Sequence, residues 1–275
     1  MLLNENHSIF SISDFVEKKD TFFKINENKI KKFLKQFMPS LSLSFKSKEN
    51  IESLSEILLR VNPTPLVLII GGSIEGDGIK VLKDKIANNI IETDVSFGPL
   101  TQIICDAHDI PFHDKSFDCV IVQAVMEHVI DPFRCADEIH RVLKDQGFVY
   151  AETPFMQQVH GREYDFTRFT PLGHRRLFRR FEEVNSGPLL GTATSLLWAL
   201  KYFLLSVSDN QTIRRILGIL FNFTCFWIKY LDLLFINNEG TLDGASGLFF
   251  VGQKKNTILD DKSLVKQYRG GFKKS

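Results

Sequence analysis

The feature that most constrains the fold is a short apolar run, Leu66-Val67-Leu68-Ile69-Ile70, which ends directly at Gly71 and Gly72. A strand whose successive positions are all apolar is typical of a parallel sheet covered on both faces. Pro63 and Pro65 stand just before the run and end the preceding helical pattern. We therefore predict that this run forms the central strand of a buried sheet.

Strand and helix patterns alternate after this strand. We expect strands over residues 90–93, 102–105, 119–123, 148–152, 181–185 and 247–252, and helices over 76–87, 132–143 and 171–180. Such alternation predicts a Rossmann-like, doubly wound α/β fold with a mostly parallel sheet and an antiparallel last strand. The connection 95–101 is too short for a crossover helix, so a loop is expected there.

Three further segments surround the predicted sheet. Residues 1–62 carry apolar side chains at helical spacing among lysines and are expected to form an N-terminal helical cap. The main domain would span residues 63–255, with a helical hairpin inserted over residues 189–236. Residues 256–275 are expected to be a flexible basic tail.

The inserted hairpin is unusually apolar, with one helix expected over residues 195–207 and a second over residues 213–235. Apolar stripes of this kind favour packing on the domain or a homodimer interface. Peripheral membrane contact is the alternative, since Trp198 and Trp227 suit the headgroup region. A single crossing of the bilayer is excluded because both flanking strands should join one sheet.

The charge and cysteine content indicate which partners and which cellular compartment to expect. Lys and Arg total 34 against 33 Asp and Glu, so no overall field attracts nucleic acid. The 4 cysteines lack CxxC spacing, which indicates buried thiols in a reducing cytoplasm. No secretion signal is evident at the N-terminus, and no histidine or cysteine spacing indicates a metal site. We expect a cytoplasmic protein, with membrane association an option through the hairpin.

Polar or glycine residues follow three consecutive predicted strands. The first strand leads into a turn that contains Gly71, Gly72, Ser73 and Gly76. Asp94 follows the second strand, and Asp106-Ala107 follows the third. The carboxyl ends of parallel strands meet at one edge of a sheet, and glycine lets a ligand approach the backbone there. The sequence therefore predicts a nucleoside pocket.

The run DAHDIPFHDKSFDCVIVQAVMEHVIDPFRCADEIHRVLKDQGFVYAETP resembles class I S-adenosylmethionine-dependent methyltransferases of the methyltransferase type 11 group. The resemblance implies S-adenosyl-L-methionine as the cofactor, with its methionine end against the turn Gly71–Gly76. It further implies that Asp94 binds the ribose hydroxyls and that Asp106 and Ala107 contact the adenine. Gln123 would lie beneath the sulfonium.

Two departures from the family pattern keep rival functions open. Ile69 occupies a position where similar proteins usually carry an acid, and Ser73 replaces a second glycine. A nicotinamide-dependent oxidoreductase could use the same glycine turn with Asp94. A non-catalytic domain that binds a membrane or partner through its hairpin is the rival from another class.

Two histidines are candidates for the acceptor side. Methyl transfer from a sulfonium needs a well-positioned acceptor, and a base that removes the acceptor proton accelerates it. His160 is expected to be the base or binder, and His128 its structural neighbour. The other histidines considered are expected at the surface or at helix caps: His108, His113, His140 and His174.

A loop of mixed polarity surrounds His160. Its candidate substrate-binding residues are Arg162, Tyr164, Asp165 and Arg168. The run VHGREYDFTRFTPLGHRRLF resembles the acceptor loop of methyltransferases encoded among glycan-building enzymes, which implies O-methylation of a sugar, glycan precursor or related metabolite in polysaccharide biosynthesis. Alternatively, Arg168 and Asp165 pair with each other and merely hold the loop.

Overall fold

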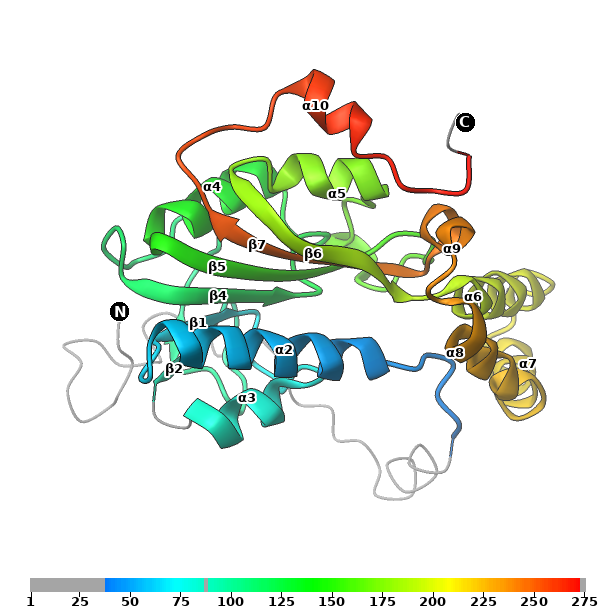
Figure 1. The fold of residues 1–275 in the computed structure, drawn as a ribbon. Helices are drawn as coiled ribbons and strands as arrows, with labels where there is room; N and C mark the ends of the chain where they lie inside the picture. Colours follow the sequence, from blue (N-terminus) through cyan, green and yellow to red (C-terminus); the bar gives the residue numbers. More distant parts are fainter. Residues whose placement is uncertain (1–37, 87–88, 273–275) are drawn as a thin grey trace.

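The computed structural model describes residues 38–86 and 89–272. Its strands are β1 (Val67–Ile70), β2 (Ile90–Asp94), β3 (Ile103–Ile104), β4 (Phe117–Gln123), β5 (Leu143–Pro154), β6 (Phe181–Leu190) and β7 (Gly247–Lys254). They form one sheet in the order β3-β2-β1-β4-β5-β7-β6 (Figure 1). Strands β1 to β5 pair in parallel, and β7 runs antiparallel to both of its neighbours. The predicted Rossmann-like fold is confirmed.

Helices cover both faces of this sheet and also form the hairpin between β6 and β7. They are α2 (Phe45–Val61), α3 (Ile79–Ile86), α4 (Pro132–Val142), α5 (Pro171–Leu177), α6 (Thr192–Leu205), α7 (Gln211–Cys225), α8 (Asp232–Phe235), α9 (Glu239–Gly244) and α10 (Asp261–Lys266), with short 3₁₀ helices η2 (Arg162–Tyr164) and η3 (Phe226–Leu231). In Figure 1, α2 and α3 lie below the sheet and α4 and α5 above it. Of the predicted N-terminal cap, residues 1–37 lie outside the described residues.

The central strand β1 explains why the apolar run is continuous. All four of its side chains are buried. Leu68 and Ile70 join a core with α4 and α5, whereas Val67 and Ile69 join a core with α2 and α3. Alternate side chains of a strand point to opposite faces, so a strand between two helical layers must be apolar at every position.

Several boundaries differ from those the sequence indicated. No helix separates β2 from β3, as expected from the short connection, and β3 itself is only 2 residues long. The second hairpin helix, predicted as one piece, is divided into α7, η3 and α8. The helix α9, between the hairpin and β7, was not predicted.

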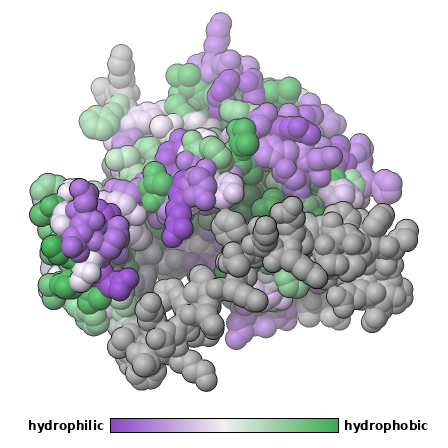
Figure 2. All heavy atoms as spheres, turned by 180° about the vertical axis from the view of Figure 1, so that it is seen from behind, coloured by the Kyte–Doolittle hydropathy of each residue, from purple (hydrophilic) through white to green (hydrophobic). Residues whose placement is uncertain are grey.

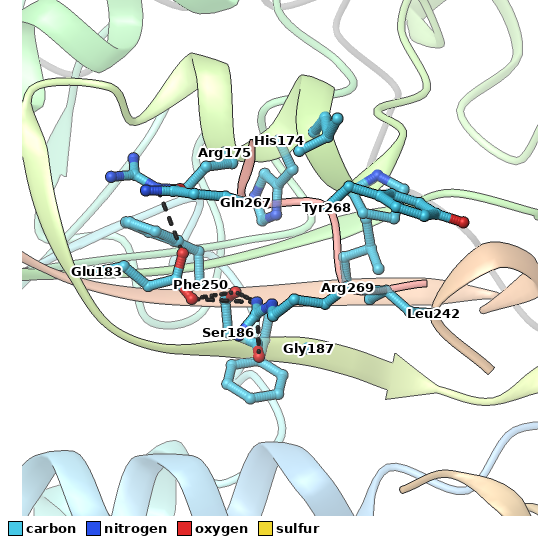
Figure 3. Close-up of a pocket in the computed structure, with 14 residues that line it drawn as sticks. His174, Arg175, Glu183, Ser186, Gly187, Leu242, Phe250, Gln267, Tyr268 and Arg269 are labelled. Carbon is cyan, nitrogen blue, oxygen red and sulfur yellow. Dashed lines mark hydrogen bonds and ion pairs between the residues drawn. The ribbon is translucent and has the colours of Figure 1, made fainter. Parts of the chain in front are cut away.

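The expectation of a flexible tail is wrong for residues 256–272, which fold back onto the domain and include α10. Figure 3 shows Arg175 and Arg269 directed at Glu183 on β6, at 3.3 and 3.1 Å. Arg175 also donates a hydrogen bond to Gln267 at 3.0 Å. Within the tail, Arg269 pairs with Glu183 and Tyr268 donates a hydrogen bond to Asp243 at 2.8 Å, and local composition does not reveal these contacts with distant segments.

The hairpin lies between β6 and β7 in the sequence, and these two strands pair with each other in the sheet. The segment Gln211–Phe235 is long and apolar enough, by length and composition, to cross a membrane, with 22% of its most apolar window buried. Its flanking strands nevertheless join one sheet, as the sequence predicted. Figure 2 shows hydrophobic residues gathered at the left edge of that view, the side on which α6 and α7 lie.

Candidate active site

A cavity of about 190 Å³ lies at the carboxyl ends of β1, β2, β4 and β5. Its walls come from the glycine turn after β1, from Gln123 and Ala124 after β4, and from the side chains of Glu92 and Glu152. This edge is where open α/β sheets bind their ligands, because the strand order reverses there. Ile69 and Ile74 border the cavity without filling it.

The glycines of the turn are required by close approach. Gly71 has a φ of +77°, and a Cβ at this position would lie 2.3 Å from Cγ2 of Val125. A Cβ on Gly76 would lie 2.2 Å from Oε1 of Gln123. Gln123 in turn donates a hydrogen bond from Nε2 to the carbonyl of Asp77 at 3.0 Å. The structure thus brings the turn and Gln123 together at one wall of the cavity.

Two buried carboxylates line the same cavity. Glu92 and Glu152 are each 7% exposed. Glu92 lies beside Ile69 in the register of β1 and β2, and its Oε1 is 2.9 Å from Nζ of Lys83. Glu152 accepts a hydrogen bond from the hydroxyl of Tyr150, and burial raises its pKa. Sequence reasoning missed both: each glutamate stands within a predicted strand, but no local pattern shows that it is buried.

Asp94 lies at the end of β2 next to the glycine turn. Its Oδ2 accepts a hydrogen bond from the backbone N–H of Ser73 at 3.2 Å. Its Oδ1 accepts from the backbone and hydroxyl of Ser96 at 2.9 and 3.0 Å. The structure thus brings Asp94 and Ser73 together at the rim, and neither lines the cavity itself.

Asp106 and Ala107 lie further along the sheet edge. Asp106 is exposed and accepts hydrogen bonds from the backbone of His108 at 2.9 Å and from its Nδ1 at 2.6 Å. Burial raises the pKa of Asp106 and these hydrogen bonds lower it, with a net shift downwards. Ala107 is buried in the core that includes α4. Neither residue lines the cavity beside Gln123.

The loop after β5 is held in place by contacts between its own residues. The Arg168 guanidinium pairs with Asp165 and holds the pKa of that carboxyl well below its usual range. Arg168 also donates to the carbonyls of Gln157 and Gln158 at 3.0 and 3.1 Å. This geometry matches the alternative in which the pair holds the loop. Arg162 and Tyr164, the other two predicted substrate contacts, are exposed.

His128 and His160 meet at a buried glutamate. Oε1 of Glu127 lies 3.7 Å from Nε2 of His128 and 3.5 Å from Nε2 of His160. The two imidazole rings are 5.0 Å apart between centroids. The backbone carbonyl of Glu127 accepts hydrogen bonds from Phe166 and Thr167 at 2.8 and 3.2 Å, which joins this loop to the end of β4. The structure brings both predicted histidines together, and sequence reasoning missed Glu127.

Two other histidines were misplaced by the sequence prediction. His140 and His174 are buried, at 5% and 2% exposure, rather than at the surface or a cap. Both lie on the inner faces of their helices, and Nε2 of His140 contacts the carbonyl of Lys255 at 2.9 Å. The expected buried thiols are found at Cys105, Cys119 and Cys135.

Comparison with known proteins finds a family match and distant relatives. Residues 68–151 match the family described as "Methyltransferase domain". The ubiquinone/menaquinone biosynthesis C-methyltransferase UbiE of Marinomonas sp. (strain MWYL1) is 29% identical over 111 residues, which cover 38% of this chain and 42% of that protein. The demethylmenaquinone methyltransferase of Thermotoga maritima is 31% identical over 105 residues, covering 34% and 44%. The chain thus spans less than half the length of these curated relatives.

A solved structure shares the fold over a longer stretch. Phosphoethanolamine N-methyltransferase 2 of Haemonchus contortus, solved in complex with S-adenosyl-L-methionine, is similar to this chain with a TM-score of 0.50 and 16% identity. The similarity covers 88% of this chain and 60% of that one. At this identity the likeness shows the shared architecture of the sheet and its helices.

Proposed function

We propose that the protein is an S-adenosylmethionine-dependent methyltransferase, since residues 68–151 match the family described as "Methyltransferase domain". The observation that carries the proposal is the cavity where the glycine turn, Gln123 and two buried carboxylates meet. S-adenosylmethionine, when bound, supplies a methyl group on a positively charged sulfonium. A site for this ligand therefore needs apolar walls, backbone access and negative charge, and this cavity has all three.

Residues of the cavity and of its rim would each contact a different part of the ligand. Glu92 and Glu152 would face the cationic amino group and sulfonium at the methionine end, and Glu92 would supply the carboxylate that Ile69 does not. Asp94 would accept hydrogen bonds from the ribose hydroxyls. Asp106 would accept one from the adenine amino group.

The acceptor is proposed to be a hydroxyl group on a sugar, glycan precursor or related small metabolite. The polar loop after β5 supports this choice, because its hydrogen bonds to the carbonyl of Glu127 bring His160 to the segment that follows β4 and Gln123. His160 is assigned to the acceptor side as a base or binder. The two curated relatives bear the names of quinone methyltransferases, which makes a ring carbon the second candidate for the methylated atom.

Isothermal titration tests the cofactor assignment against the oxidoreductase alternative. The full chain should bind S-adenosylhomocysteine and not NAD. Replacement of Asp94 by Asn removes a charged acceptor, and hydrogen bonds to charged groups contribute about 1.5–3 kcal/mol, so we expect affinity to fall by about 10-fold to 100-fold.

Two further variants sharpen this test. Glu92→Gln should weaken S-adenosylhomocysteine as well, since it removes a buried charge from the methionine end. Asp145→Asn is the matched control: Asp145 pairs with Lys115 at the surface, at 2.8 Å, near the opposite end of β5. Binding of NAD alone, or equal affinity in all variants, contradicts the proposal.

We also propose that the protein is cytoplasmic and rests on a membrane surface through α6 and α7. Phe203 in the last turn of α6 and Val207 just after that helix are each 70% exposed, and Trp227 in η3 is 55% exposed. Large apolar side chains gathered on one surface are typical of an interaction site, and tryptophan suits the headgroup region. Arg215 on α7 is exposed and would favour anionic lipid.

A further inference from the structure

Glu127 is a buried carboxylate for which the described residues provide no hydrogen-bond donor. Its side chain is 0% exposed, and neither Oε1 nor Oε2 accepts a hydrogen bond. Burying an ionised carboxylate without a partner costs several kcal/mol. The nearest polar atoms are Nε2 of His160 and Nε2 of His128, at 3.5 and 3.7 Å from Oε1. A positive charge between these three atoms would neutralise the carboxylate.

The opposite nitrogens of both imidazoles face hydrogen-bond acceptors. Nδ1 of His128 is 2.7 Å from the carbonyl oxygen of Tyr164. Nδ1 of His160 lies 3.4 Å from the carbonyl of Gln158 and 3.7 Å from Oδ2 of Asp165, and Nη2 of Arg168 is 3.5 Å away. A ring that donates Nδ1–H to an oxygen presents the lone pair of Nε2, and this arrangement is the usual support of a metal-binding histidine. Both lone pairs then point towards Glu127.

The spacing of the three atoms suits a metal ion. One nitrogen from each histidine and one carboxylate oxygen all lie within 4.8 Å of one another. A metal with bonds of about 2.0–2.2 Å places its ligands about 3–3.5 Å apart, so small side-chain shifts suffice here. Gly161 permits this approach, because a Cβ there would lie 2.4 Å from Cε1 of His128.

We propose that Glu127, His128 and His160 bind a divalent transition-metal ion, of the class that includes Zn²⁺, Fe²⁺ and Co²⁺. Two histidines and one carboxylate are a ligand set that leaves coordination positions open. The open positions face outwards, since the imidazole side chains are 27% and 36% exposed whereas the glutamate is 0% exposed. No metal-ligand spacing is visible in the sequence, because His160 reaches the other two residues only through the loop after β5.

The metal has a consequence for the acceptor side, and this step rests on the proposed methyltransferase function. An ion at this position would coordinate an acceptor oxygen and favour its deprotonated form. Nε2 of His160 cannot accept a proton while it is bound to a metal. His160 would then act as a metal ligand and would not be the base that deprotonates the acceptor. The metal site itself does not depend on the methyl transfer.

Direct metal binding tests the proposal. Untagged full-length protein is freed of metal by chelation and dialysis, then titrated with Co²⁺ by visible absorbance and with Zn²⁺ by equilibrium dialysis. One equivalent should bind, with the absorption bands of nitrogen- and oxygen-coordinated Co²⁺, and the melting temperature should rise with Zn²⁺ concentration. Glu127→Gln and His160→Ala should each lower the affinity at least tenfold.

The controls separate this proposal from the proposed function. His113→Ala removes an exposed histidine outside the cluster and should bind metal like the unmodified chain. If Glu127→Gln does not fold, His128→Ala and His160→Ala carry the test, since both side chains are partly exposed. No stoichiometric binding, or equal affinity in every folded variant, overturns the metal site. S-adenosylhomocysteine titrated into the same samples reports on the cofactor site separately.

Discussion

At the residue scale, the side chain with the clearest effect on stability is His174. It is 2% exposed among Phe169, Phe178 and Phe250, and its Nε2 has no hydrogen-bond partner in the described part of the chain. Burial lowers its pKa from 6.5 to about 3. The folded protein therefore holds this imidazole neutral over a pH range in which the unfolded chain takes up a proton.

The folded form should lose stability as pH falls below 6.5, because only the unfolded state then gains a proton at His174. The loss should reach about 2 kcal/mol at pH 5 and continue towards the folded pKa. Urea denaturation of the unmodified chain and of His174→Phe, at pH 7 and pH 5, measures it. Between pH 7 and pH 5, the free energy of unfolding of His174→Phe should fall by about 2 kcal/mol less than that of the unmodified chain. That of His113→Phe should fall by as much as in the unmodified chain. An equal loss in all three proteins would disprove the assignment.

Sequence predicted individual residues where the cause was local. The glycines of the turn were predictable because positive φ and close approach are properties of the turn itself. Glu92 and Glu127 were not, because their burial depends on neighbours from distant segments of the chain. Lys83 reaches Glu92 from α3, and the loop containing His160 closes over Glu127.

At the element scale, Asp232 connects α8 to the start of α6, which directly follows β6. It is 2% exposed and accepts hydrogen bonds from the backbone N–H groups of Gly191, Ala193 and Thr194 at 3.1, 2.8 and 3.2 Å. A carboxylate at this position satisfies the free N–H groups at the start of α6 and favours its positive end. Helical periodicity within residues 213–235 does not reveal a contact with Gly191, so this role of Asp232 was not predicted.

Asp232→Ala should leave those backbone groups buried without an acceptor. Each unsatisfied group costs about 1–3 kcal/mol, so we expect the free energy of unfolding to fall by at least about 2 kcal/mol. Thermal or urea denaturation provides the measurement. Asp209→Ala, which removes an exposed acid between α6 and α7, should change the free energy by less than about 0.5 kcal/mol. Equal effects in the two variants would show that Asp232 does not cap α6.

At the scale of the whole molecule, the order of strands and helices could be predicted from the sequence. The position of the C-terminal tail against the sheet could not. The alternation of strands and helices determined the sheet, because every strand between two helical layers must be apolar. The position of the tail depended on pairing between Arg269 and Glu183, residues far apart in the sequence.

The surface of α6 and α7 predicts binding to lipid. The full chain should float with vesicles that contain anionic phospholipid, and Phe203→Asp combined with Val207→Asp should reduce the bound fraction several-fold, because it places charge where apolar side chains would meet the acyl region. Ile258→Asp replaces an apolar residue that is 58% exposed outside the hairpin and serves as the control. A dimer in light scattering that the double variant dissociates, without any flotation, would contradict the membrane proposal.

The place of β7 between β5 and β6 has a consequence for biosynthesis. Within the described sheet, β6 pairs with β7 alone, so it cannot dock until residues 247–254 have left the ribosome. The apolar segment 192–235 is translated before that strand. A nascent chain therefore presents its most lipophilic part to chaperones or bilayer before the sheet can close.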